Sequence, residues 1–157
     1  MLSKYVDTPS IIQVIGCVCK VPQLLDYSDK YILTEEDFPD QFHQIVFGTI
    51  FKLHELGAEK ISMNSILDYL AARPKYEAVF IKQKGEEWLT KAVENAQTAS
   101  FDYYYNRVKK MTLLRAFDNF GFDVSDIYDP DNIVDLKKKQ LQEDQLDNAT
   151  LESLVQR

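Results

Sequence analysis

Apolar residues recur along most of the chain three or four positions apart, which is the spacing of an amphipathic helix. The first run follows Thr8-Pro9, and this pair predicts a helix with Thr8 as N-cap and Pro9 at its first position. Pro22 is expected to end it. Its apolar members are Ile11, Ile12, Val14, Ile15 and Val18. Because they cover most of the helix surface, we expect this helix to be buried.

A second long helix is predicted between an acidic start and a glycine stop. Thr34 precedes three acidic residues, which favours a cap followed by an acidic first turn, and Gly57 is typical of a helix end. The apolar residues between them are Phe38, Phe42, Ile45, Val46, Ile50 and Leu53. Ser62 predicts the cap of a further helix, with Ile66, Leu67 and Leu70 pointing inward and Pro74 as its boundary.

The C-terminal third of the chain predicts a helical hairpin. One helix is expected from about residue 100 to 128, and Asp129-Pro130-Asp131 then starts a mostly charged one. The predicted fold class is therefore all-α, with a compact multi-helix head over residues 1–99 and the hairpin over residues 100–146. Residues 147–157 begin a further helical segment.

The stretch from Leu113 to Tyr128 is apolar on more than one side. Such a helix must bury both sides, and the charged helix after it offers few apolar residues. This favours a partner chain as the covering surface, and the alternative is a helix buried wholly in its own domain. The predicted protein-interface residues are Leu113, Leu114, Phe117, Phe120, Val124, Ile127, Ile133, Leu136 and Leu141.

The formal net charge of -7 argues against a primary DNA-binding function, because phosphate contacts supply most of the affinity of DNA binders. One local pattern points the other way, since three tyrosines precede several cations and such a mixture can stack bases and hold phosphates. The candidate nucleic-acid contacts are Tyr103, Arg107, Lys109 and Lys110. The alternative is core tyrosines beside a solvated basic face.

Motifs that carry catalysis are missing from this sequence. There is no phosphate-binding loop, no nucleophile elbow and no zinc-ligand pattern, so we expect neither catalysis nor a cofactor in this chain. His43 and His54 would lie about 16 Å apart along one helix, and His43 is predicted to be a partly buried, hydrogen-bonded structural residue. Cys17 and Cys19 are predicted to be buried free thiols. The sequence shows no secretory signal and no run long enough to span a membrane, so a cytoplasmic protein is expected.

Several short strings occur in a particular order. They are Val14-Ile15-Gly16, then Leu33-x-x-x-Asp37-Phe38-x-x-x-x-His43-x-x-Val46-Phe47, then Gly85-x-x-Trp88-Leu89, then Tyr104-x-x-x-Val108 and Leu114-Arg115. Together they resemble the N-terminal domain of DnaB-type replicative helicases over about residues 9–128. Gly85 stands where that family has paired glycines, and residues 95–98 replace a proline-containing loop. These departures indicate a divergent, phage-borne member.

The resemblance implies a function in association. In that family the hairpins pair, and three pairs form a collar on a hexameric ring that receives primase and, in some systems, loader proteins. ATP and Mg²⁺ belong to a separate motor domain, to which residues 147–157 would begin the linker, so DNA would be contacted only indirectly. Two alternatives are a free-standing replication adaptor, such as the helicase-binding domain of a primase, and a single-stranded nucleic-acid binder.

Overall fold

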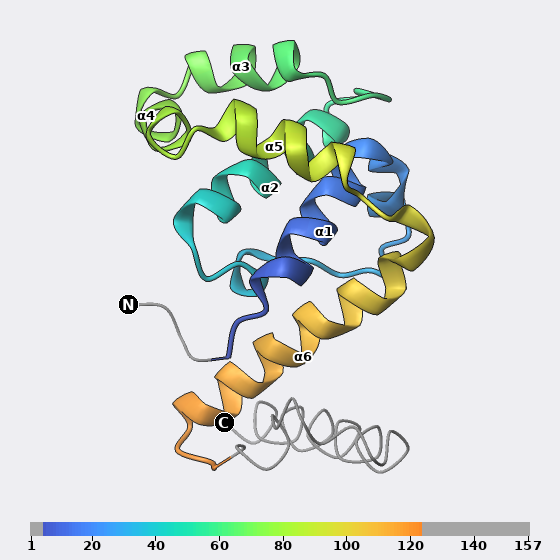
Figure 1. The fold of residues 1–157 in the computed structure, drawn as a ribbon, viewed down its shortest axis with the longest axis vertical. Coiled ribbons are helices and arrows are strands. Elements are labelled where there is room, and N and C mark those ends of the chain that lie inside the picture. Colours follow the sequence, from blue (N-terminus) through green and yellow to red (C-terminus); the bar gives the residue numbers. More distant parts are fainter. Residues whose placement is uncertain (1–4, 124–157) are drawn as a thin grey trace.

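The structure is a computed structural model, and it describes residues 5–123. These residues form six α-helices and three short 3₁₀ helices, with no strand in the described range (Figure 1). The α-helices are α1 (Thr8–Lys20), α2 (Gln41–Glu55), α3 (Met63–Ala71), α4 (Pro74–Lys82), α5 (Gly85–Glu94) and α6 (Phe101–Asn119). The 3₁₀ helices are η1 (Pro22–Asp26), η2 (Glu35–Asp37) and η3 (Thr98–Ser100). The predicted all-α fold class is confirmed.

Helix α1 lies at the centre of the arrangement and contacts α2, α5 and α6 (Figure 1). Helices α3 and α4 pack on α2 and on each other, on the far side of the fold from α6. In Figure 1, α6 runs diagonally away from the other helices toward the bottom of the view. We call α1 to α5 the head, and α6 is the helix that leaves it.

Two predicted helix starts were misplaced. The N-cap of α1 is Asp7, whose carboxylate accepts the N–H of Ser10 at 3.0 Å, so Thr8 is already the first helical residue. The acidic run after Thr34 forms only η2, and α2 begins later, where Asp40 accepts the N–H of Phe42 at 2.9 Å. Proline disfavours a helical conformation in the residue before it, and Pro39 therefore separates η2 from α2. The predicted stops and caps at Pro22, Gly57 and Ser62 are confirmed.

The predicted helix from residue 100 to 128 was too long. Helix α6 ends at Asn119, and Gly121 follows it with a φ of 88°, a conformation that glycine adopts readily. The N–H of Phe122 donates to the carbonyl of Phe117 at 3.0 Å, and the N–H of Gly121 donates to that of Asp118 at 2.9 Å. These two bonds define a Schellman motif, which closes the helix.

The head has one apolar core, in which α1 and α2 supply most of the buried side chains. Phe38 is fully buried, and its ring stacks on Phe47 with the ring centroids 4.7 Å apart. Cys17 and Cys19 are buried free thiols as predicted. Burial raises the pKa of each thiol to about 11, so both are protonated near neutral pH.

His43 is more buried than predicted and contacts the rings of Phe42 and Trp88, which also contact each other. Its buried Nδ1 has no hydrogen-bond partner among the described residues, although a hydrogen-bonded histidine was predicted. Burial lowers the pKa of His43, and the negative charge of Asp40 only partly opposes that shift. The imidazole is therefore neutral near neutral pH.

Candidate protein-interaction site around α6

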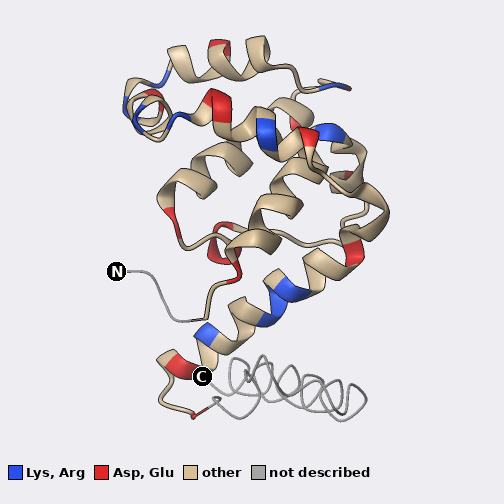
Figure 2. Cartoon of the chain, in the orientation of Figure 1, with Lys and Arg blue, Asp and Glu red and all other residues tan. Residues whose placement is uncertain are grey.

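The side of α6 that faces the head carries an unusual number of charged and polar groups. Lys and Arg are coloured along the middle and toward the C-terminal end of this helix in Figure 2. We call the contacts between these groups and the head the α6 junction. These contacts hold α6 against the head.

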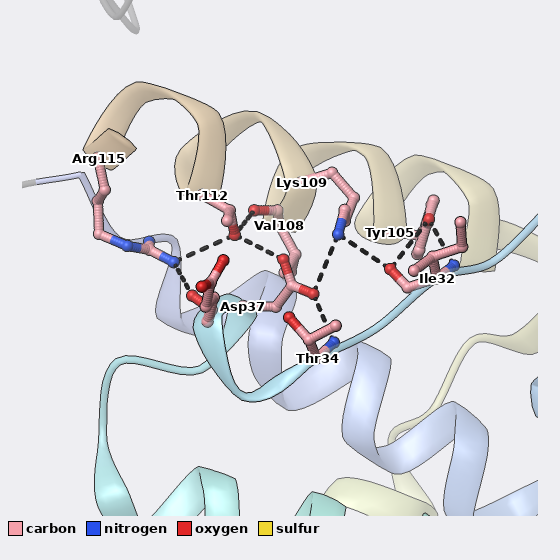
Figure 3. Close-up of polar contacts among 9 residues, drawn as sticks. Ile32, Thr34, Asp37, Tyr105, Val108, Lys109, Thr112 and Arg115 are labelled. Carbon is pink, nitrogen blue, oxygen red and sulfur yellow. Dashed lines mark hydrogen bonds and ion pairs between the residues drawn. The ribbon is translucent and has the colours of Figure 1, made fainter. Parts of the chain in front are cut away.

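A buried carboxylate lies at the middle of the junction (Figure 3). Asp37 is fully buried, yet three donors surround its two oxygens. The hydroxyl of Thr112 donates to Oδ1 at 2.7 Å, while the N–H of Thr34 and the Nζ of Lys109 reach Oδ2 at 2.9 Å and 3.1 Å. Lys109 balances the negative charge, and the hydrogen bonds replace the water that the carboxylate loses on burial.

Arg115 extends the junction one turn further along α6 (Figure 3). Its guanidinium donates to the carbonyl oxygens of Tyr5 and Glu36, each at 2.7 Å, and to the hydroxyl of Thr112 at 3.1 Å. Burial lowers the pKa of Arg115, while the charge of Asp37 opposes this shift. A guanidinium presents several donors in a rigid plane. Arg115, which belongs to α6, therefore holds this helix in a fixed geometry against two other parts of the chain, namely η2 and the segment that precedes α1.

The beginning of α6 is tied to the loop that follows η1. The hydroxyl of Tyr105 accepts the N–H of Ile32 at 2.8 Å, and Lys109 donates to the carbonyl of Ile32 at 2.9 Å (Figure 3). Asp102 accepts a hydrogen bond from the hydroxyl of Tyr31 and forms an ion pair with Lys30 at 3.6 Å. This loop therefore lies against α6 through hydrogen bonds and ring contacts together.

A third ion pair joins α6 to the start of α1. The Nε of Arg107 lies 2.6 Å from an oxygen of Asp7, the N-cap of α1. Burial raises the pKa of Asp7, but the hydrogen bonds from Ser10 and Arg107 outweigh it, and the pKa lies below its usual value. One carboxylate thus caps α1 and holds α6.

Two of the four candidate nucleic-acid contacts, Arg107 and Lys109, take part in these ties. Arg107 and Lys109 are paired with Asp7 and Asp37, two acids that no sequence pattern connected with them. Tyr103 is exposed, and the guanidinium of Arg107 lies 5.5 Å from its ring centre. Lys110 is half-buried. A phosphate would have to compete with a carboxylate for Arg107 and for Lys109.

The C-terminal half of α6 carries the predicted interface residues that the structure describes. Leu114 and Phe117 are buried in a small apolar cluster with Tyr5 and Met111, and Leu113 packs against it. Phe120 is 43% exposed, and Phe122, which lay outside the predicted set, is 54% exposed. The ring of Phe122 contacts that of Phe117 at 5.4 Å. An aromatic surface therefore remains accessible at the end of α6.

The remaining predicted interface residues lie outside the described residues. They are Val124, Ile127, Ile133, Leu136 and Leu141. The predicted second helix of the hairpin and the predicted boundary between residues 146 and 147 also lie there. Within residues 5–123, no three His, Cys, Asp or Glu side chains are grouped so that they could hold a metal ion. Over the same range no helix is long and apolar enough to cross a membrane.

Comparison with known proteins agrees with the resemblance read from the sequence. Residues 12–110 match the family described as the DnaB-like helicase N terminal domain, a span from α1 into α6. The chain is 36% identical over 149 residues to the SPbeta prophage-derived uncharacterized protein YorI of Bacillus subtilis (strain 168). That alignment covers 95% of this chain and 29% of the relative. No solved structure matches the chain.

Proposed function

Because this chain belongs to the family of DnaB-like helicase N-terminal domains, we propose that it forms the collar of a ring-shaped replicative helicase and docks a primase or a loader. The chain is a helicase-associated replication domain, and the N-terminal domain of this family is itself non-catalytic. The proposal assigns it two kinds of contact. One joins copies of the chain through α6 and the residues C-terminal to it, and the other receives a partner protein on the outer surface.

The observation that carries the proposal is the α6 junction. A helix that only completes a core needs apolar contacts, whereas α6 is also held by three ion pairs, one of them to the buried carboxylate of Asp37, and by a guanidinium on backbone carbonyls. Hydrogen bonds depend on angle and distance, so they fix direction in a way that apolar burial does not. A ring of identical subunits needs such a fixed direction, because a small angular error repeats at every interface.

The motor of the helicase is part of the proposal for the whole protein. The chain spans 29% of the length of its prophage-derived relative. We propose that ATP and Mg²⁺ act in a separate motor domain and that DNA reaches this domain only indirectly.

Sedimentation velocity on the 157-residue chain tests the collar. We expect dimers or larger rings in the micromolar range. Replacing Phe120 and Phe122 together by Ser should weaken association at least tenfold, because both rings are partly exposed at the end of α6. The matched control is Leu56→Ser, which removes a 76% exposed leucine just after α2 in the head. A chain that sediments as a monomer at several hundred micromolar would contradict the proposal.

A further inference from the structure

A second surface lies along α2 and adjoins the α6 junction at Thr34. It is a groove of about 590 Å³ between α2, the loop before it and the helices α3 and α4. Its apolar lining includes Ile45, Phe47, Phe51, Tyr69 and Tyr76. Phe51 is 39% exposed and Tyr76 is 49% exposed. We call this surface the α2 groove.

A glycine lies in the floor of the α2 groove, in the middle of a 15-residue helix. Glycine is among the poorest helix formers, so such a position usually has a steric reason. For Gly48 no such reason exists among the described residues, because a Cβ built there would meet nothing within 4 Å. The bare backbone of Gly48 therefore lines the groove with open space beside it. A small residue at such a place lets the backbone of a second helix approach closely.

The two ends of the α2 groove carry opposite charges. Glu35, the first residue of η2, lines the end of the groove that precedes α2, and its carbonyl accepts a hydrogen bond from the side chain of Gln44. Lys52 lies at the other end and forms an exposed ion pair with Glu55 at 3.3 Å. A surface ion pair of this kind contributes little to stability. Lys52 lies eight positions after Gln44 in the same helix, which corresponds to about 12 Å along the axis.

We propose that the α2 groove binds an α-helix of a partner protein, with Gly48 as the point of closest approach. The bound helix has an apolar face with a small residue at its centre. It carries a cation opposite Glu35 and an anion about two turns away, opposite Lys52. This inference rests on the docking part of the proposed function and gives that part a location and a partner chemistry.

The test selects helical 18-residue peptides with a randomised face against the whole chain and measures the affinity of the selected peptides by fluorescence anisotropy. Gly48→Leu fills the floor of the groove and should weaken binding at least tenfold. The matched control Ala78→Leu adds the same side chain at an exposed position of α4 and should leave binding unchanged. Gly48→Ala should raise the melting temperature by a few degrees and still weaken binding, since a better helix former then occupies the contact.

Charge gives an independent readout. Exchanging the two charges, with Glu35→Lys and Lys52→Glu in one chain, should reverse the preference between a selected peptide and its charge-swapped version. If neither Gly48→Leu nor the charge exchange changes the affinity of the selected peptides, the proposal that they bind in the α2 groove is refuted. If the affinity of those peptides falls with the Phe120 and Phe122 replacements instead, the docking function is retained but is located at another surface. If no helical peptide binds and the chain also sediments as a monomer, both the α2 groove proposal and the proposed function are refuted.

Discussion

Asp37 and Phe38 are neighbours in the sequence, but they belong to two regions built on different physical principles. The ring of Phe38 lies in the apolar core of the head, stacked on Phe47. The carboxylate of Asp37 lies in the α6 junction, equally buried but surrounded by donors. Burial of apolar surface stabilises without preferring a direction, and charge-assisted hydrogen bonds add direction at a high desolvation cost. The head is thus built for stability and the junction for orientation.

The largest effect should come from the core. Phe38→Ala removes a fully buried ring, and we expect the free energy of unfolding to fall by about 3–5 kcal/mol. Urea denaturation followed by circular dichroism measures this loss. Phe51→Ala is the control, because that ring is 39% exposed in the α2 groove, and it should cost less than half as much. Equal losses for the two variants would mean that Phe38 contributes no more than a surface ring.

A smaller and more local effect is expected in the junction. Asp37→Asn keeps the shape but leaves Lys109 without its ion pair, and we expect a loss of about 2–3 kcal/mol. This figure lies at or below the usual range for a buried pair because the Lys109 side chain is 34% exposed and can be hydrated. Hydrogen exchange should accelerate in α6 more than in α2. Adding Lys109→Met to Asp37→Asn should recover part of the loss, and uniform acceleration in both helices would contradict a separate orienting function.

The smallest effect concerns the ion pair of Asp7 and Arg107. Because the folded pKa of Asp7 is below its usual value of 3.8, its contribution is complete well above that pH. It is lost as the pH falls through the folded pKa, and below that pKa the folded and unfolded states bind the proton alike. Asp7→Asn retains a good N-cap residue and should cost less than about 1 kcal/mol near neutral pH, since Arg107 is 47% exposed. Unfolding measured from pH 6 to pH 2 should show a shallower decline for this variant than for the wild type, and parallel curves would refute the pairing.

Local signals in the sequence were enough to predict most of the fold. Pro22, Gly57 and Ser62 act through their own backbone and side chains, and each marks a helix end in the structure. The two largest errors had local signals as well. Pro39 before Asp40 was a sign that α2 starts late, and Gly121 was a sign that α6 stops early.

The α6 junction could not be predicted in the same way. Asp37 and Lys109 are 72 positions apart, and each by itself resembles an ordinary surface charge. Their pairing depends on how α6 lies across the head, which no local pattern encodes. Periodicity therefore identifies the apolar residues of α6 but not the acids that hold its cations.

The position of the Schellman motif at the end of α6 determines the direction in which the chain continues. Each residue of an α-helix advances the backbone by about 1.5 Å and turns it by about 100°. Arg115 fixes the helix on the head, and Gly121 redirects the chain less than two turns later. A single residue inserted between these two positions would barely lengthen α6. It would, however, turn the direction in which the chain leaves the helix by more than a quarter of a circle. The number of residues in that short interval, more than their chemistry, determines the direction in which the chain leaves the helix.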